Sequence, residues 1–263
     1  MKKTTLAFSL TALLGSALLT PIAGAQEGKT IKLAVDVPYT PFEYRTPEGK
    51  LTGFEIELGD ALCAQAKLNC SWVEQSWDGI IPGLLARKYD AILSSMSITP
   101  ERERQVLFST PYYMTPNIWV AKRDRDIDVS DKASLKGLSV GVQRGTTRDN
   151  YLTQRYSDVL DIRRYGSGED AALDLQSGRI DLAFMDYPVA QSTLKFKGDE
   201  APFKQLGEGI RTPESIFGKG AALAFRKRDK DLAEKFNQAL ETVKHNGTYD
   251  RLMHKYFDYD IKI

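Results

Sequence analysis

The sequence predicts an α/β fold of two similar lobes, each built on a mostly parallel sheet flanked by helices. Patterns typical of strands and of helices alternate along almost the whole chain, as they do in sheets whose strands are joined by helices. The segment LARKYDAILSS at 85–95 is similar to LQSGRIDLAFMD at 175–186, since each contains a helix end, a turn and an apolar strand that follows an aspartate. This local similarity indicates two lobes of related build.

The first series of elements extends from residue 31 to residue 121. Residues 31–35 form a short apolar strand, and residues 53–67 carry apolar side chains at helical spacing. Further strands are expected at 71–74, 90–93 and 118–121, and a further helix at 78–87.

A second series begins at Leu135 and repeats the alternation. Strands are expected at 138–142, 161–165 and 180–185, with helices at 146–156, 168–178 and 188–195. A late strand at 221–225 precedes two helices within 229–256, and the helical pattern is broken near Asn246-Gly247.

We expect the chain to cross between the lobes twice, near Thr115 to Ile118 and between Gly209 and Gly220. Lobe I then contains residues 26–115 and 219–263, and lobe II contains residues 116–218 with the crossings.

The first 25 residues have the pattern of a secretory signal peptide. Lys2 and Lys3 precede the apolar run LAFSLTALLGSALL, and Ala23-Gly24-Ala25 supplies small residues before Gln26. A retained membrane anchor is the alternative, but the apolar run is shorter than the roughly 20 residues that cross a bilayer. We expect cleavage after Ala25 and a protein that works outside the cytoplasm.

Cys63 and Cys70 are the two cysteines of the chain, in the segment CAQAKLNC. In an oxidising compartment an even number of cysteines indicates disulfides. A metal pair is the competing interpretation, but it requires nearby histidine or further cysteine, and His245 and His254 lie far along the chain. We therefore expect a disulfide and no metal.

The charge balance argues against a nucleic-acid-binding protein. The formal charge of +1 falls to −1 once Lys2 and Lys3 are removed, whereas such proteins carry a basic patch or a pI above about 9.

The segment SSMSITPERE at 94–103 is the richest in candidate binding residues. Its serines, Ser94, Ser95 and Ser97, follow an apolar strand. Thr99 has the features of a helix N-cap with proline at the first helical position, which puts Arg102 in the first turn. A cation is unfavourable there, so we expect an anionic partner held by a bidentate contact. An exposed arginine in a charged run is the alternative.

Other candidates follow the carboxyl ends of predicted strands, where ligands bind in α/β sheets. Gly145-Thr146-Thr147 opens a helix and offers backbone amides to an anion. Asp36 and Asp186 can hold ammonium groups. Tyr39 and Trp77 lie on turns after strands, and the alternative for both is an ordinary half-buried aromatic side chain.

These motifs together resemble the periplasmic solute-binding proteins of polar amino-acid ABC transporters. The resemblance covers essentially the whole mature chain and is nearest to the lysine/arginine/ornithine- and histidine-binding branch, which also has the two cysteines at this place and spacing. It implies the type II fold of this family, with the ligand cleft between the lobes. The segments that carry it are VDVPYTPFEYRTPEGKLTGFEIELGDALCAQ, SWDGIIPGL, YDAILSSMSITPERE, FSTPYY, LKGLSVGVQRGTT, GRIDLAFMD and NGTYDRLMHKYF.

The resemblance implies a role for each candidate residue. Arg102 corresponds to the arginine that binds the ligand α-carboxylate, with Ser97 and Thr147 as helpers. Asp186 corresponds to the acceptor of the α-ammonium, with Ser95 as a second acceptor. The remaining roles belong to the ligand side chain: Tyr39 and Trp77 sandwich it, and Asp36 and Ser94 lie at its tip.

Two residues depart from the branch. Trp77 stands where phenylalanine is frequent, and Gln143 stands where an apolar residue is frequent. Arg144 adds a positive charge that either disfavours cationic ligands or faces solvent.

The resemblance implies capture of a free L-amino acid in the periplasm, closure of the lobes and delivery to an inner-membrane ABC permease. Asp36 at the tip, with Glu43 and Glu55 as possible outer helpers, favours arginine, ornithine or lysine. Histidine, glutamine and opines are alternatives that suit Gln143. A chemoreceptor or sensor is a further possible partner, and we expect a monomer without a cofactor.

An enzyme is the rival of a different class, since related folds include periplasmic dehydratases. The chain has no GxSxG motif and no clustered histidines, and we expect no catalysis.

Overall fold

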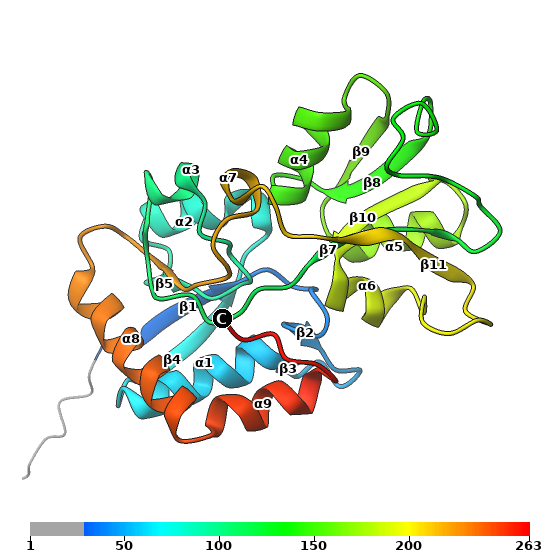
Figure 1. The fold of residues 1–263 in the computed structure, drawn as a ribbon. Helices are drawn as coiled ribbons and strands as arrows, with labels where there is room; N and C mark the ends of the chain where they lie inside the picture. The colour runs from blue at the N-terminus through cyan, green and yellow to red at the C-terminus, as the bar shows by residue number, and fades with distance from the viewer. Residues whose placement is uncertain (1–28) are drawn as a thin grey trace, which may run out of the picture.

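The computed structural model describes residues 29–263, so the predicted signal peptide and its cleavage after Ala25 lie outside the described residues. Figure 1 shows two lobes, each with a central sheet and helices around it. The fold class predicted from the sequence is confirmed.

Lobe I is built on a five-stranded sheet in the order β4-β1-β5-β12-β6. Helix α1 packs against α8 and α9, and α8 also packs on β12. These three helices lie together below the sheet in Figure 1. The bounds in this lobe are β1 (Ile31–Val35), the hairpin β2 (Tyr44–Arg45) and β3 (Leu51–Thr52), α1 (Phe54–Gln65), β4 (Cys70–Glu74), the 3₁₀ turn η1 (Trp77–Gly79), α2 (Ile80–Leu85), β5 (Ala91–Ile92), α3 (Pro100–Glu103), β6 (Leu107–Phe108), β12 (Ala224–Phe225), α8 (Lys230–His245) and α9 (Thr248–Tyr256).

Lobe II is built on a five-stranded sheet in the order β11-β7-β10-β8-β9. Its buried core includes Trp119, Phe184 and Leu152. The bounds here are β7 (Asn117–Lys122), β8 (Ser139–Gln143), α4 (Thr147–Tyr156), β9 (Asp161–Tyr165), α5 (Gly168–Gln176), β10 (Leu182–Asp186), α6 (Tyr187–Thr193), β11 (Phe203–Ile210) and α7 (Glu214–Phe217).

Within residues 29–263, one strand of each sheet runs against the other four. β12 is antiparallel to both β5 and β6, and β7 is antiparallel to both β10 and β11. Each is the first strand after the chain enters its lobe from the other one. The other strands end at the cleft, so a chain that arrives through the cleft must run away from it. Both sheets are therefore mostly parallel, as predicted.

The chain passes from one sheet to the other between Phe108 and Asn117 and returns between Ile210 and Ala224. The C-terminal segment also ends at the junction of the lobes (Figure 1), where the Met114 amide donates to the Ile261 carbonyl at 2.9 Å. The two predicted crossings overlap these connections, and the lobe limits stay a prediction.

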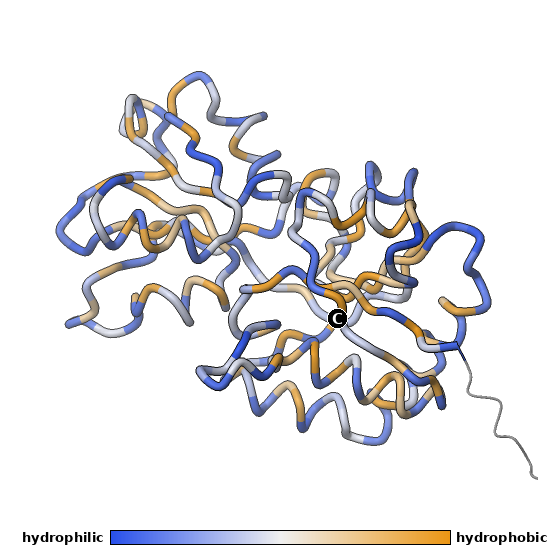
Figure 2. The backbone as a smooth tube through the Cα atoms, turned by 180° about the vertical axis from the view of Figure 1, so that it is seen from behind, coloured by the Kyte–Doolittle hydropathy of each residue, from blue (hydrophilic) through white to orange (hydrophobic). Residues whose placement is uncertain are grey.

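The distribution of apolar residues explains why the main elements were predictable. In Figure 2 the orange segments run through the middle of both lobes, and the outer loops are mostly blue. Helix α8 ends at His245 and α9 begins at Thr248, with Gly247 between them at φ 76°. Glycine adopts this left-handed conformation without steric cost, which explains the predicted break.

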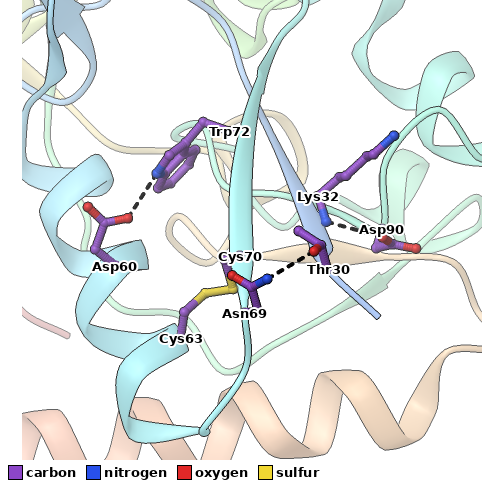
Figure 3. The surroundings of a disulfide bond; sticks show 8 residues. All are labelled: Thr30, Lys32, Asp60, Cys63, Asn69, Cys70, Trp72 and Asp90. Carbon is purple, nitrogen blue, oxygen red and sulfur yellow. Dashed lines mark hydrogen bonds between the residues drawn. A yellow bond between two sulfur atoms is a disulfide. The ribbon is translucent and has the colours of Figure 1, made fainter. Parts of the chain in front are cut away.

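The predicted disulfide between Cys63 and Cys70 is present. It joins the last turn of α1 to the first residue of β4 (Figure 3). Beside it the Trp72 indole donates to Asp60 at 2.9 Å, and the Asn69 amide donates to Thr30 at 3.0 Å. The bridge therefore stabilises the edge of lobe I at the amino ends of its strands.

Within residues 29–263, no helix combines the length and apolar character needed to span a bilayer. The same part of the chain contains no cluster of three or more His, Cys, Asp or Glu side chains that could hold a metal.

Candidate binding site between the lobes

A cavity lies where the carboxyl ends of the strands of the two lobes meet. The structure brings all the predicted ligand-binding residues except Asp186 to its wall, and Asp186 lines the adjoining cavity. The lining residues are Asp36, Tyr39, Glu43, Trp77, Ser94, Ser95, Ser97, Arg102, Gln143, Thr146, Thr147 and Arg148.

Arg102 is a buried cation with no anionic partner among the residues that the structure describes. The Thr99 hydroxyl accepts a hydrogen bond from the Arg102 amide at 3.3 Å, which is the predicted N-cap of α3. The guanidinium donates to the Ser97 carbonyl at 3.1 Å and lies 5.0 Å from the centre of the Trp77 ring. Burial and the nearby Arg148 lower its pKa to about 10. Among residues 29–263, no carboxylate lies within 4.0 Å of it, so an incoming anion is its natural partner.

Ser94 and Ser95 of lobe I donate hydrogen bonds to two buried carboxyl groups. Ser95, at φ 51°, donates its amide to Glu55 at 2.7 Å, and the Ser94 hydroxyl donates to Glu43 at 2.8 Å. Burial, followed by repulsion from Glu55, raises the pKa of Glu43 well above its usual range. Glu55 therefore holds the backbone of Ser95, and Glu43 holds the side chain of Ser94.

Asp36 receives a hydrogen bond from the other lobe. The Gln143 amide donates to its Oδ2 at 2.7 Å, and the Asp36 amide donates to the Ser94 hydroxyl at 2.9 Å. Burial raises the pKa of Asp36 to about 6 although the Gln143 hydrogen bond lowers it. Gln143 is one of the two residues that differ from the lysine/arginine/ornithine- and histidine-binding branch. It binds Asp36, the residue predicted to lie at the tip of the ligand side chain.

The two aromatic residues reach across the cleft. The Tyr39 hydroxyl donates to Asp186 Oδ2 at 3.2 Å, and the Trp77 indole donates to the Gly145 carbonyl at 3.1 Å. Both rings line the cavity; Tyr39 is buried and Trp77 is half-buried.

Lobe II contributes the start of α4 and the end of β10. The Thr146 hydroxyl caps α4 by accepting from the Asp149 amide at 3.3 Å and donates to the Gln143 carbonyl at 2.8 Å. Asp186 ends β10, and its Oδ1 is buried without a hydrogen-bond partner among the described residues. That oxygen is available to an N–H group of a ligand.

Arg148 is the site residue that the sequence interpretation missed. Its Nη1 lies 3.7 Å from Asp186 Oδ2 and 3.3 Å from Asn117 Oδ1, and its Cζ lies 5.8 Å from the centre of the Tyr39 ring. The sequence does carry a feature that indicates Arg148: like Arg102, it is a cation in the first turn of a helix, where a cation is unfavourable without an anionic partner.

Further polar contacts join the lobes at the mouth of the cleft. The Thr40 hydroxyl donates to Glu169 at 2.8 Å, and Arg144 lies 3.3 Å from Asp78. Arg144 therefore makes an exposed ion pair at the mouth. The structure is a closed arrangement of the lobes.

The chain is similar to several known binding proteins. The L-arginine-binding protein of Pseudomonas aeruginosa is 39% identical over 234 residues, 89% of this chain and 90% of that protein. The histidine-binding periplasmic protein of Salmonella typhimurium is 35% identical over 262 residues, 99% of each chain. The solved structure of a periplasmic binding protein of Salmonella typhimurium with high arginine specificity is similar with a TM-score of 0.79, at 32% identity, over 87% of this chain and 99% of that one.

All three are named as binding proteins and not as enzymes. The model of one family matches residues 31–259, nearly all of the described chain. The chain belongs to the bacterial extracellular solute-binding proteins, family 3.

Proposed function

We propose that this protein captures a free basic L-amino acid, with arginine preferred over ornithine and lysine, in the periplasm and delivers it to an ABC permease. The observation that carries this proposal is the separation of charges in the cavity. Asp36 lines only the central cavity described above. Arg102 and Thr147 line that cavity and also a second groove, which lies at the mouth of the cleft. A ligand with a carboxylate at one end and a cation at the other end matches both groups.

The ligand then makes contacts with both lobes. Its α-carboxylate binds Arg102, helped by Ser97 and Thr147, and its α-ammonium binds Asp186, with Ser95 as a second acceptor. Its methylene chain lies between Tyr39 and Trp77, and its cationic tip reaches Asp36 beside Ser94. The support is the position of these side chains in and next to one cavity, together with the arginine-binding relatives.

Histidine is the second candidate, because the histidine-binding relative matches 99% of the chain. Gln143 can donate and accept, so it also suits an imidazole or an amide. Glutamine and opines are weaker alternatives on the same ground.

A thermal-shift screen tests the proposal with the twenty amino acids, ornithine and citrulline, followed by calorimetry. A ligand at 100 times its Kd adds about 2.7 kcal/mol of stability. We expect arginine to give the largest shift. A larger shift with glutamate or with an apolar amino acid contradicts the assignment, and no shift with any amino acid contradicts the function.

The protein acts as a monomer in this proposal, and its closed form is what a permease, or a chemoreceptor, recognises. Light scattering with and without arginine checks the first part, because a ligand-independent dimer contradicts it.

A further inference from the structure

The segment that follows α9, residues 257–263, forms a strap that is anchored on lobe I. In Figure 1 this C-terminal strap runs from α9 back to the junction of the lobes. At its start the buried Phe257 ring lies 5.3 Å from the ring of Phe42 in the core of lobe I, measured between ring centres. Further along, the buried Ile261 accepts a hydrogen bond from the Met114 amide in the first crossing. The strap is therefore fixed on lobe I and on the first crossing.

Between these two anchors the strap contacts lobe II. The ring centres of Tyr259 and Tyr187 lie 5.4 Å apart with an interplanar angle of 81°, the edge-to-face arrangement that aromatic pairs prefer. Asp258 of the strap lies 3.2 Å from Lys197, whose Nζ also lies 5.5 Å from the centre of the Tyr187 ring. The two residues of the strap and the two of lobe II therefore form one cluster, centred on Tyr187.

Tyr187 is the first residue of α6 and directly follows Asp186, the expected acceptor of the α-ammonium. Its amide donates to the Pro116 carbonyl at 2.9 Å, so the first crossing holds its backbone and the strap holds its side chain. Asp186 is the N-cap residue of α6, but its side chain makes no capping hydrogen bond. The carboxylate of Asp186 is thus free to face the cleft, and its position depends in part on how Tyr187 is held.

We propose that Tyr259 is a positioning residue of the binding site, which acts through Tyr187 to hold Asp186 where the α-ammonium of a bound amino acid requires it. This inference rests on the proposed contact between the α-ammonium and Asp186, and it extends the site to a segment outside the cleft. Arg102, the proposed partner of the α-carboxylate, belongs to lobe I, whereas Asp186 belongs to lobe II. Because the strap is anchored on lobe I and packs on the neighbour of Asp186, it fixes these two groups relative to each other.

Two ligands isolate the contribution of the α-ammonium. The compound 5-guanidinopentanoate has the carboxylate, the methylene chain and the guanidinium of arginine, with hydrogen in place of the α-ammonium. By calorimetry we expect the wild-type protein to bind arginine at least about tenfold more tightly than this compound, the usual effect of a charge-assisted hydrogen bond. Tyr259→Ala should reduce this preference by about threefold to tenfold, the range that the loss of one aromatic pair gives.

Further variants separate the ring of Tyr259 from the rest of the strap. Tyr259→Phe keeps the ring and should keep the preference, because the hydroxyl is buried without a hydrogen-bond partner among the described residues. Lys262→Ala is the matched control, since Lys262 belongs to the same strap but pairs with Asp250 of lobe I, and it should leave the preference unchanged. The double variant Lys197→Ala with Asp258→Ala serves if Tyr259→Ala does not fold, and it should reduce the preference by about twofold to threefold.

The outcomes separate this inference from the proposed function. If Tyr259→Ala weakens the binding of both ligands equally, the strap acts only on stability or closure and the inference is overturned. An unchanged preference in both Tyr259→Ala and the double variant overturns it as well, and the proposed function then stands. If the wild-type protein binds the two ligands equally, Asp186 does not bind the α-ammonium, so that part of the proposed function fails together with the inference.

Discussion

At the scale of single residues, the site is a set of buried charges whose partners lie on the other lobe or on the ligand. Asp36 is bound by Gln143 of lobe II, and Tyr39 of lobe I binds Asp186. Arg102 lacks a carboxylate partner among residues 29–263. Because an unpaired buried charge is unfavourable, the site is complete only when the lobes close on an anion.

Arg102→Ala should lower the affinity for arginine by about 2–5 kcal/mol, because it removes one partner of a buried charge pair. Arg102→Lys should not restore binding, since the planar donor fork is lost. Calorimetry measures both, and Arg104→Ala is the matched control, as Arg104 is exposed on the same turn. Affinity like that of the wild type in either Arg102 variant would falsify the carboxylate role.

The pKa of Asp36, raised to about 6 by burial, makes arginine binding dependent on pH. A cationic tip binds the ionised carboxylate, so affinity should fall as the pH drops through about 6, by about tenfold per pH unit below it. Asp36→Asn should weaken arginine binding by about 1–3 kcal/mol at pH 7 and should remove this pH dependence. Calorimetry from pH 5 to pH 8 checks it, and a flat profile in the wild-type protein rules out the role.

The raised pKa of Asp36 has the opposite effect on the stability of the ligand-free protein, which falls as the pH rises. A carboxyl whose folded pKa is raised stabilises the fold below its unfolded value of 3.8, and that contribution is lost as the pH rises through about 6. Ionised Asp36 therefore costs on the order of 2–3 kcal/mol at pH 7. We expect ligand-free Asp36→Asn to be more stable than the wild type at pH 7 and not at pH 4, by denaturant unfolding.

Sequence patterns predict a residue's position when its signal is local. The cap of Thr99 and the first-turn position of Arg102 depend on neighbouring residues, and both are present. The bond from Gln143 to Asp36 joins residues 107 positions apart, and no pattern within a segment contains it. Arg148 also has a local signal, its place in the first turn of α4, but the cavity that it shares with Arg102 forms only where the two lobes meet.

At the scale of elements, the central strands and long helices were predictable because their apolar spacing is regular. The elements that the sequence did not indicate are short or polar: the hairpin of β2 and β3, β6, α7 and β11. β11 (FKQLGEGI) is an edge strand with two glycines and an irregular register, so it lacks both alternation and an apolar run. β11 forms because it pairs with β7, and this pairing cannot be predicted from the residues of β11 alone.

The disulfide should stabilise the fold without affecting the site. Cys70 begins β4, whereas the site lies beyond the carboxyl end of that strand. Closing so short a loop contributes about 2.5 kcal/mol in the chain-entropy model. The double variant Cys63→Ser with Cys70→Ser should lose about this stability in denaturant unfolding and keep its affinity for arginine. A tenfold loss of affinity would show that the edge of lobe I positions the site.

At the scale of the whole molecule, the two crossings of the chain determine how the lobes can move relative to each other. Few residues connect two otherwise separate sheets, so small dihedral changes there can open the cleft as a hinge. The topology follows from the predicted alternation and from the two crossings. The closed arrangement of the lobes cannot be predicted in this way, because it depends on contacts between distant residues, such as that of Thr40 with Glu169.

Ligand binding should therefore close the lobes, and small-angle scattering should show a smaller radius of gyration with saturating arginine than without it. Glu169→Ala removes a contact that joins the lobes outside the cavity, so it should favour the open form and weaken arginine binding severalfold. Glu208→Ala, at an exposed position of β11, is the matched control. If scattering is identical with and without arginine while calorimetry shows saturation, the ligand enters a cleft that is already closed. Glu169→Ala should then leave the affinity unchanged, so the two measurements together decide whether binding is coupled to closure.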